Sequence, residues 1–352
     1  MTFKPFDIHS QEQFNSFALE TFHFQAQHCE VYRSYIALLG KDPKEVTSVR
    51  EIPFLPIELF KTHTVYCGAQ PPQHLFTSSA TSGMTPSKHH IADLSLYEES
   101  LSRTFRLFFD PPERYTLLAL LPSYLERQGS SLVYMVDCLM KQSGAPDNGF
   151  YLHNHEELYR QLLKLQDEEV RRTQVRRTLL IGVAFALLDF VEKYRLDFPN
   201  LEVVETGGMK GRGKELTRTE LHQKLSQGLG TAHIFSEYGM AELLSQAYAK
   251  GGNLFTLPPW MAVYIRDLHD PFRLLPAGQK GGINIIDLAN RYSCSFIETQ
   301  DMGTLHHPYL SDYQAADIRD CQATGHQDHQ TFEFIGRIPH SDLRGCNLLM
   351  ET

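Results

Sequence analysis

A stretch rich in serine and threonine has the residue types that bind a polyphosphate. Residues 77–88 read TSSATSGMTPSK, so they offer hydroxyl groups, a flexible glycine, backbone N–H groups and a closing lysine. Backbone N–H groups beside a positive charge form a concave site for phosphate. Linkers share this composition, so the segment alone is weak support for a phosphate site.

A second segment has the spacing of a nucleotide-binding P-loop. Residues 208–214 read GMKGRGK, keep the Gly-x-x-x-x-Gly-Lys spacing, and lie between a predicted strand and a predicted helix. The next residue is Glu215, where a P-loop has serine or threonine for Mg²⁺, and its carboxylate would face the phosphates. We therefore rank this hypothesis below the serine- and threonine-rich loop.

The heptad at residues 236–242 combines an aromatic ring, a glycine and a carboxylate. Tyr238 is followed by Gly239, which allows close backbone approach, and Glu242 lies four residues after the ring. A nucleotide site could use all three groups. Taken alone, the heptad fits slightly better with a buried tyrosine that precedes the start of a helix.

Two polar turns follow predicted strands further along the chain. One contains Thr299, Gln300 and Asp301, and the other begins with Gly336 and Arg337. Binding residues concentrate on loops that a rigid scaffold carries. Each turn alone is only a strand that ends in a polar loop.

The elements that must position these residues follow from hydrophobic periodicity. Residues 10–39 have helical spacing, and strands and helices then alternate, which implies parallel strands with helices on both faces. Beyond residue 236, short apolar runs broken by Gly, Pro and Asp predict a β-rich lobe. The predicted helices are 94–109, 130–141, 156–172, 184–194 and 215–227, and the predicted strands are 115–121, 178–181, 201–205, 262–265, 282–287 and 332–336.

Composition excludes several classes of protein. The 352 residues carry 33 Lys and Arg against 42 Asp and Glu, and the net charge of −9 argues against a nucleic-acid partner. The longest apolar run, residues 179–188, has about half the length needed to cross a bilayer. The chain starts without a signal-peptide pattern and its six cysteines form no Cys-x-x-Cys pair, so we expect a cytoplasmic protein without a membrane span.

One loose metal motif is present near the end of the chain. Cys321, His326 and His329 have roughly the spacing of zinc ligands. They fall in a segment that reads as a turn between two strands, and no second ligand pair accompanies them. We therefore do not expect a zinc site.

Taken in order, the motifs resemble those of the adenylate-forming superfamily of acyl-CoA synthetases, luciferases and nonribosomal adenylation domains. Six weak motifs agree in one order over roughly residues 76–345, which chance does not readily produce. The matching segments are the phosphate loop 79–88, the Leu-Pro segment 121–122, the adenine-side turn 206–209, the Tyr-Gly-x-x-Glu signature 238–242, the Thr-Gly-Asp turn 299–301, in which Gln300 stands for the glycine, and the Gly-Arg hinge entry 336–337.

This resemblance implies the fold and its parts. An adenylate-forming large domain is α/β, with helix-flanked, mostly parallel sheets and a smaller β-rich lobe, here after a helical N-terminus. We expect a helical N-terminal segment at 1–72, an α/β subdomain with the phosphate loop and the adenine-side turn at 73–235, and a mixed β-rich lobe with a short C-terminal tail at 236–352.

The resemblance also implies roles for single residues. Lys88 would hold the β- and γ-phosphates of ATP with Thr81 and Ser82, and Glu242 would ligate Mg²⁺. Tyr238 would lie against adenine, and Asp301 and Arg337 would hold the ribose hydroxyls. The full expected nucleotide-binding set is Ser79, Thr81, Ser82, Gly83, Gly207, Gly208, Tyr238, Gly239, Asp301 and Arg337.

Within the superfamily, the chain looks most like the acyl-protein synthetases of the bacterial bioluminescence fatty-acid reductase complex. Those enzymes are similarly short and carry the acyl group on a cysteine near the C-terminus, which Cys346 matches here. The resemblance implies ATP-dependent activation of a carboxylic acid, expected to be a fatty acid, and transfer to the Cys346 thiol. Lys88 and Glu242 would complete the catalytic set, and an acyl-accepting reductase or carrier protein is the expected partner.

Two alternatives stay open. A CoA ligase of the phenylacetate type would pass the acyl group to free CoA. A degenerate nucleotide-binding subunit would only scaffold a reductase or synthase, but a scaffold has no need for the metal ligand expected at Glu242.

Overall fold

The fold is organised around one large mixed sheet. The computed structural model describes residues 4–78, 85–122, 129–171, 176–207, 216–307 and 330–338. Among these residues the sheet has 12 strands, in the order β11-β12-β13-β14-β10-β9-β8-β7-β6-β4-β5, with β1 (Leu55–Pro56) paired to β13. The strands of the main path are β4 (Tyr115–Leu120), β5 (Gly149–Phe150), β6 (Arg177–Val183), β7 (Glu202–Thr206), β8 (Ile234–Tyr238), β9 (Ala247–Lys250), β10 (Leu254–Thr256), β11 (Met261–Arg266), β12 (Lys280–Asp287), β13 (Phe296–His307) and β14 (Thr331–Arg337).

One half of this sheet is parallel and has helices on both faces, as the alternation predicted. β5, β4, β6, β7 and β8 pair in parallel. Leu118 and Leu120 of β4 pack in one core with the helices on one face, and Leu117 and Ala119 pack in the other core, because successive side chains of a strand point to opposite faces. The helices around this half are α4 (Leu94–Phe108), α5 (Ser131–Ser143), α6 (His155–Val170), α7 (Ala184–Lys193) and α8 (Arg218–Leu229), which confirm the predicted helices.

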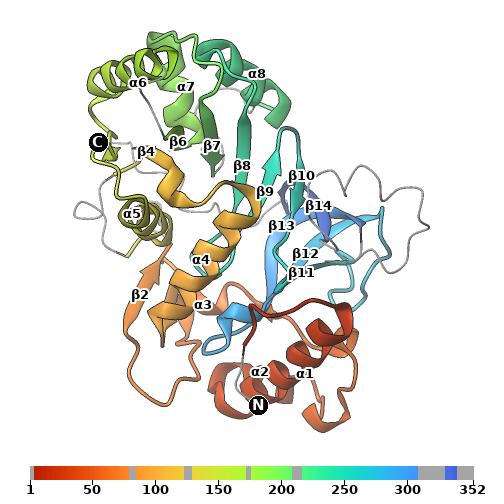
Figure 1. Cartoon of the computed structure of the whole chain (residues 1–352). Helices are drawn as coiled ribbons and strands as arrows, with labels where there is room; N and C mark the ends of the chain where they lie inside the picture. The colour runs from red at the N-terminus through yellow and green to blue at the C-terminus, as the bar shows by residue number, and fades with distance from the viewer. Residues whose placement is uncertain are drawn as a thin grey trace.

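The other half is antiparallel and begins at β8. β8 pairs in parallel with β7 and antiparallel with β9, so the expected boundary between residues 235 and 236 falls inside the strand where the sheet changes its direction. The two predicted lobes are thus joined by one continuous sheet (Figure 1). The predicted strands of the β-rich part are confirmed as β11, β12 and β14.

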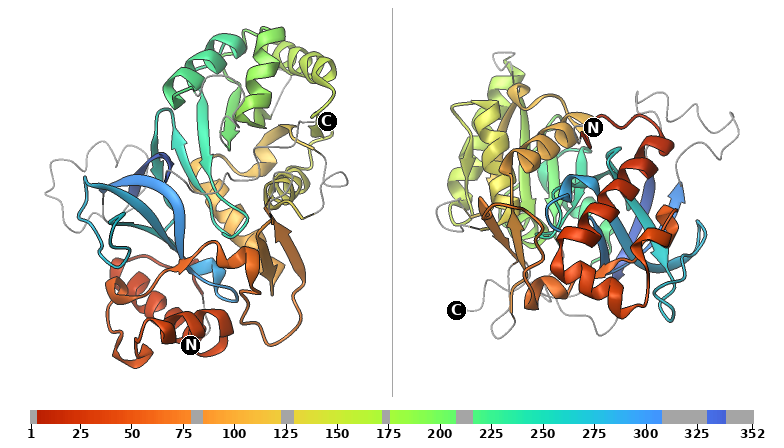
Figure 2. Two further views of the ribbon diagram at one scale, coloured as in Figure 1. Left: turned by 180° about the vertical axis from the view of Figure 1, so that it is seen from behind. Right: turned by 90° about the horizontal axis from the view of Figure 1, so that it is seen from below.

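The N-terminal helices pack on the antiparallel half. α1 (Gln11–His28) and α2 (Glu30–Leu38) lie at the end of the molecule opposite α6, α7 and α8 (Figures 1 and 2). Phe22 and Tyr32 contact Phe296 of β13, with ring centroids 6.1 and 6.2 Å apart. The Gln25 amide donates to the Asn290 and Arg291 carbonyls at 3.0 and 2.8 Å. These contacts fix the helical segment on the sheet.

A small hairpin and several single turns complete the described residues. β2 (His74–Thr77) and β3 (Lys88–Ile91) form a separate antiparallel pair. The short helical turns are α3 (Leu59–Thr62), η1 (Pro43–Glu45), η2 (Val49–Glu51), η3 (Pro112–Arg114) and η4 (Leu288–Asn290).

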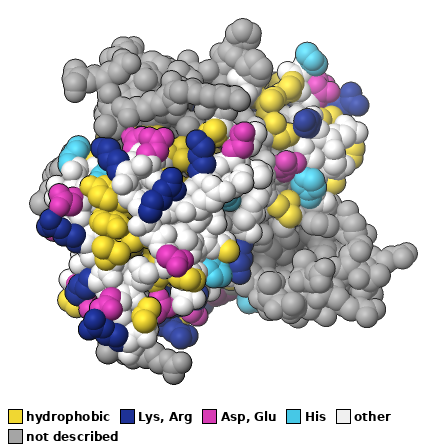
Figure 3. All heavy atoms as spheres, turned by 90° about the horizontal axis from the view of Figure 1, so that it is seen from above, with side chains coloured by type: hydrophobic (Ala, Val, Ile, Leu, Met, Phe, Trp, Pro, Cys, Tyr) yellow, Lys and Arg dark blue, Asp and Glu magenta, His cyan; other side chains and the backbone are white. Residues whose placement is uncertain are grey.

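Two further observations concern the helices and the surface of the described residues. None of the helices in the described part of the chain has both the length and the apolar content that a bilayer span needs. On the face seen from above, acidic and basic side chains are interspersed over the described residues (Figure 3).

Candidate functional site

The loop predicted to bind phosphate joins β2 and β3. At its base, the Ser87 N–H donates to Ser78 Oγ at 2.9 Å, and the Ser78 N–H donates to the Ser87 carbonyl at 3.2 Å. Ser87 Oγ is buried and has no hydrogen-bond partner among the described residues. A buried hydroxyl in this state is destabilising by roughly 1–3 kcal/mol, so this place suits a bound polar group. Lys88 follows as the first residue of β3, with its side chain exposed.

Several predicted residues lie outside the described part of the chain and stay predictions. The same holds for the rival P-loop at 208–214 and for the loose zinc motif. The residues concerned are Ser79, Thr81, Ser82, Gly83, Gly208, Cys346, Cys321, His326 and His329.

Tyr238 ends β8 and is buried. Its ring is only 5% exposed and lies among Phe255, Phe332 and Phe334, with centroid distances of 5.2 to 5.8 Å. Its hydroxyl donates to Asp301 Oδ2 at 2.7 Å. A turn, not a helix, follows the strand, so the simpler interpretation of the heptad is right about the buried ring and wrong about the helix. The contact of Tyr238 with adenine stays a prediction.

Asp301 and Arg337 face each other across the neighbouring strands β13 and β14. The turn predicted at residues 299–301 is therefore wrong, because β13 continues through these residues to His307. They are directly paired in the register of β13 and β14, and Arg337 Nε lies 3.9 Å from Asp301 Oδ1. Gln300 bridges two further side chains, since its amide donates to the Glu58 carboxylate and its oxygen accepts from Arg337. The residue in the glycine position of the family pattern therefore orients Arg337.

Glu242 lies in the turn after β8, and other carboxylate contacts hold this turn. The Leu244 and Ser245 N–H groups donate to Asp287 Oδ2 at 2.8 and 2.9 Å, and Ser245 Oγ donates to Asp287 Oδ1 at 2.7 Å. Asp287 is fully buried, and burial raises its pKa although these hydrogen bonds oppose that effect. The Glu242 residue itself is 7% exposed. A fixed turn therefore carries the carboxylate predicted to bind Mg²⁺.

The adenine-side turn follows β7 and is linked to β8. Gly207 has φ +72°, in the left-handed region, and a Cβ on it would meet no described atom within 4 Å. The Thr206 hydroxyl donates to the Glu237 carboxylate. A Cβ on Gly239 would lie 2.2 Å from Glu237 Oε1, so glycine at 239 leaves room for this contact. Glycine at 207 adopts this left-handed backbone without the steric cost that a Cβ would bring.

Gly207 and Tyr238 lie at the carboxyl ends of β7 and β8, the side at which open α/β sheets bind ligands, and Asp301 contacts Tyr238 there. Among the described residues no group of three His, Cys, Asp or Glu side chains could hold a metal ion. A single carboxylate is nonetheless adequate for Mg²⁺, which proteins commonly bind through one or two carboxylates and the phosphates of a substrate.

A serine, a histidine and a glutamate lie together nearby, but they do not form a hydrolytic triad. Ser236 Oγ donates to Glu205, and His222 Nε2 lies 3.0 Å from Ser236 Oγ and 3.5 Å from Glu205 Oε1. A triad needs the carboxylate on the other ring nitrogen. The Ser236 hydroxyl is also fully buried. The cluster therefore links β7, β8 and α8, and it lacks the arrangement that forms an acyl-enzyme.

The cysteines in the described part of the chain are not suited to attack an activated acyl group. Cys29, Cys67, Cys138 and Cys294 are all buried. Burial raises the pKa of each thiol, to about 11 for Cys138. Because the thiolate is the nucleophile, these groups are poor acceptors at neutral pH.

Sequence reasoning left His89 without a role, although it follows Lys88 directly. Its ring is 1% exposed, and its nitrogens contact the Ala241 carbonyl and Asn290 Oδ1 at 2.8 and 2.9 Å. The partners are 152 and 201 residues away in the sequence, so no local pattern could have indicated them.

Comparison with known proteins gives two independent matches. Residues 2–112 match the model of a protein family described as acyl-protein synthetase, LuxE. This part, less than a third of the chain, includes α1, α2, the β2–β3 hairpin and α4. No curated protein sequence matches the chain significantly.

The second match is structural. An open conformation of 2-hydroxyisobutyryl-CoA ligase, solved in complex with 2-HIB-AMP and CoA, has a TM-score of 0.69 at 12% identity, over 94% of this chain and 70% of that chain. The fold is that of the adenylate-forming ligases. The same ligase in its thioesterification state gives 0.70 at 13% identity over 95% and 69% of the two chains. The luciferase-like enzyme of the nonluminescent mealworm Zophobas morio gives 0.50 at 12% over 86% and 62%.

Proposed function

We propose that this protein uses ATP to activate a carboxylic acid as an acyl-adenylate and then passes the acyl group to a thiol. The observation that carries the proposal is the convergence at the end of β8: the Glu242 turn, the Thr206–Glu237 contact and the Tyr238–Asp301–Arg337 chain meet there. The fold of adenylate-forming ligases and the family match over residues 2–112 support it.

The chemistry explains why such residues are needed. A carboxylate oxygen attacks the α-phosphate of ATP, a new P–O bond forms, and the bond to pyrophosphate breaks. A thiolate then attacks the acyl carbon, and AMP leaves. Lys88 and the neighbouring loop would neutralise the leaving phosphates, Asp301 and Arg337 would hold the ribose, and Glu242 would ligate the Mg²⁺ that offsets phosphate charge. In the adenylation step the protein would supply position and charge, and covalent chemistry would enter only with the acceptor thiol.

We further propose Cys346 as the acceptor thiol and a fatty acid as the substrate. The four described cysteines are buried thiols with raised pKa. Cys321 and Cys346 are therefore the two cysteines to compare as acyl acceptors. A reductase or carrier protein would then take the acyl group from this thiol. In this scheme residues 73–235 supply the phosphate loop and the adenine-side turn, and residues 236–352 supply the ribose contacts and the acceptor.

The experiment has two stages. Carboxylic acids of increasing chain length are screened for acid-dependent exchange of labelled pyrophosphate into ATP, which identifies the cognate acid. The labelled acid is then incubated with ATP and three proteins: wild type, Cys346→Ser and the matched control Cys321→Ser. Hydroxylamine-labile label should appear on wild type and on Cys321→Ser, and be absent from Cys346→Ser, while all three retain exchange. Equal labelling of Cys346→Ser would contradict the acceptor assignment.

A second acceptor, free CoA, is favoured by the ligase structures that hold both 2-HIB-AMP and CoA. If this protein is a CoA ligase of the phenylacetate type, free CoA should consume the adenylate with release of acyl-CoA. Cys346→Ser should then form acyl-CoA at the wild-type rate.

A further inference from the structure

His89 connects two segments of the site. It lies on β3, directly after Lys88, and its Nδ1 is 2.8 Å from the carbonyl oxygen of Ala241 in the turn that carries Glu242. The imidazole is 1% exposed and packs edge-on against Phe60, with ring centroids 5.8 Å apart. The phosphate-loop strand and the Glu242 turn are therefore in direct contact through this ring.

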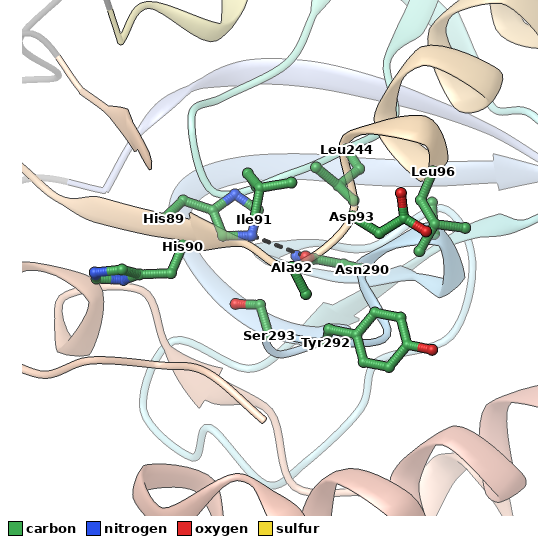
Figure 4. A pocket seen from close by; sticks show the side chains of 11 residues that line it. His89, His90, Ile91, Ala92, Asp93, Leu96, Leu244, Asn290, Tyr292 and Ser293 are labelled. Atoms are coloured by element: carbon green, nitrogen blue, oxygen red, sulfur yellow. Dashed lines mark hydrogen bonds between the residues drawn. The ribbon is translucent and has the colours of Figure 1, made fainter. Parts of the chain in front are cut away.

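Asn290, at the end of η4, completes the connection. Its Oδ1 lies 2.9 Å from His89 Nε2, and its Nδ2 donates to the Glu242 carbonyl at 2.8 Å and to the Cys294 carbonyl at 3.0 Å. Figure 4 shows the His89 ring directed at Asn290, whereas the neighbouring His90 points away. The carbonyls of both Ala241 and Glu242 are thus held by one buried network.

The network has fewer N–H protons than hydrogen-bond acceptors around the His89 ring. The Ala241 carbonyl can only accept, and Asn290 uses its N–H groups on two other carbonyls, so both nitrogens of His89 face acceptors. A neutral imidazole has one proton for these two contacts. Burial lowers the pKa of His89 to about 4, although the two hydrogen bonds oppose this, so the neutral ring predominates at pH 7.

We propose that His89 is a positioning residue that transmits the position of the phosphate-loop strand to the turn carrying Glu242. The proposal rests on the proposed function, because it gives the site a means to bring the metal-binding carboxylate into place when phosphates bind beside Lys88. A rigid link of this kind couples two binding events, and couplings in proteins typically change affinity by about 5- to 150-fold.

The first test does not depend on activity. Hydrogen exchange is measured on peptides covering residues 239–246 in wild type, His89→Phe and the matched control His90→Phe. Phenylalanine retains a ring against Phe60 and removes both polar contacts of His89, while His90 contacts Tyr66 instead, with centroids 6.3 Å apart. The amides of Leu244 and Ser245 should exchange at least about tenfold faster in His89→Phe only. Hydrogen-exchange rates in His89→Phe equal to those of the wild type would overturn the proposal.

The second test separates positioning from stability. In pyrophosphate exchange, His89→Phe should raise the KM for Mg-ATP about tenfold, leave the KM for the acid within about twofold, and show less than additive loss when combined with Glu242→Gln. Unchanged KM for Mg-ATP with only a lower melting temperature would show a purely structural residue and overturn the proposal. If His89→Phe does not fold, His89→Gln is used in both tests.

The two hypotheses fail in different ways. If no acid supports exchange by the wild-type protein, the proposed function is wrong. Hydrogen exchange with and without the Mg²⁺ complex of ATP still tests the connection through His89 between β3 and the Glu242 turn. Added protection of residues 239–246 in wild type that is absent from His89→Phe supports this connection. An equal response of both proteins contradicts it.

Discussion

At the scale of single residues, buried polar groups of the candidate site bridge segments that are far apart in the sequence. Tyr238 is the clearest case, because one hydroxyl joins the end of β8 to Asp301. Tyr238→Phe leaves the ring contacts and removes this hydrogen bond, which is worth about 1.5–3 kcal/mol when the acceptor is charged. We expect a lower free energy of unfolding by that amount and a higher KM for ATP, because Asp301 loses one of its constraints. Denaturant unfolding measures the first effect and pyrophosphate exchange the second. An unchanged KM for ATP would show that the Tyr238 hydrogen bond does not affect ATP binding.

His89 gives a prediction about pH. The folded ring titrates near pH 4 and an unfolded histidine near 6.5, so the folded state binds fewer protons between these values. The stability contribution of the neutral ring is complete above pH 6.5 and is lost as the pH falls toward 4, by at most about 3 kcal/mol. His90 is the nearby titratable group that disfavours charge on the ring. Between pH 7 and pH 4, the free energy of unfolding measured with denaturant should fall less steeply for His89→Phe than for wild type. Parallel plots of this free energy against pH would contradict the proposed titration of His89.

A substitution at Gly207 tests whether this glycine serves only the backbone conformation or also the binding of ATP. Gly207→Ala puts an L-residue at φ +72°, and we expect a loss of roughly 1–2 kcal/mol in the free energy of unfolding. Gly144, the C-cap of α5, is a matched control with φ +60° and open space around a Cβ. Gly144→Ala should lose similar stability with normal kinetics, whereas Gly207→Ala should also raise the KM for ATP. Identical kinetics of the two variants would remove Gly207 from the nucleotide site.

At the scale of elements, the two edges of the parallel half serve different purposes. The starts of β4, β6 and β7 carry a polar cluster around the buried Glu202: the Tyr115 hydroxyl donates to Glu202 Oε2 at 2.9 Å, and the exposed Arg177 pairs with Glu202. Burial raises the pKa of Glu202, and the Arg177 charge opposes that effect. The candidate site lies at the opposite, carboxyl edge.

This arrangement predicts a stability effect without a kinetic one. Tyr115→Phe should lower the free energy of unfolding by about 1.5–3 kcal/mol, because Glu202 stays buried with one hydrogen bond fewer. Pyrophosphate exchange by the folded protein should keep the wild-type kcat and KM values. A changed KM for ATP would mean that the amino edge also contributes to the site.

Hydrophobic periodicity in the sequence predicted most of the helices and strands, but few of the contacts between them. The strands and helices of the parallel half could be predicted because their apolar residues repeat with periods of two or 3.6 residues within short windows. The pairing of Tyr238 with Asp301, 63 residues away, and of His89 with Asn290, 201 residues away, depends on how the sheet changes direction at β8. Local patterns contain no information on that change, so the role of His89 could not be predicted.

At the scale of the whole molecule, one continuous sheet brings the parts of the site together. Its parallel half provides the turns after β7 and β8, and its antiparallel half provides Asp301 and Arg337 on β13 and β14. The β2–β3 hairpin reaches the same place through His89. Contacts between the two halves, rather than one local motif, therefore define the candidate site.

The most direct measurement is acid-dependent pyrophosphate exchange by wild type and Glu242→Gln with the same cognate acid. Glutamine has nearly the same size and keeps the backbone contacts that hold this turn, but it removes the charge that would bind Mg²⁺. The account predicts robust exchange by wild type and a loss of about 100-fold or more in Glu242→Gln, with a melting temperature close to that of wild type. Wild-type exchange rates in Glu242→Gln, or no exchange by wild type with any acid, would contradict it.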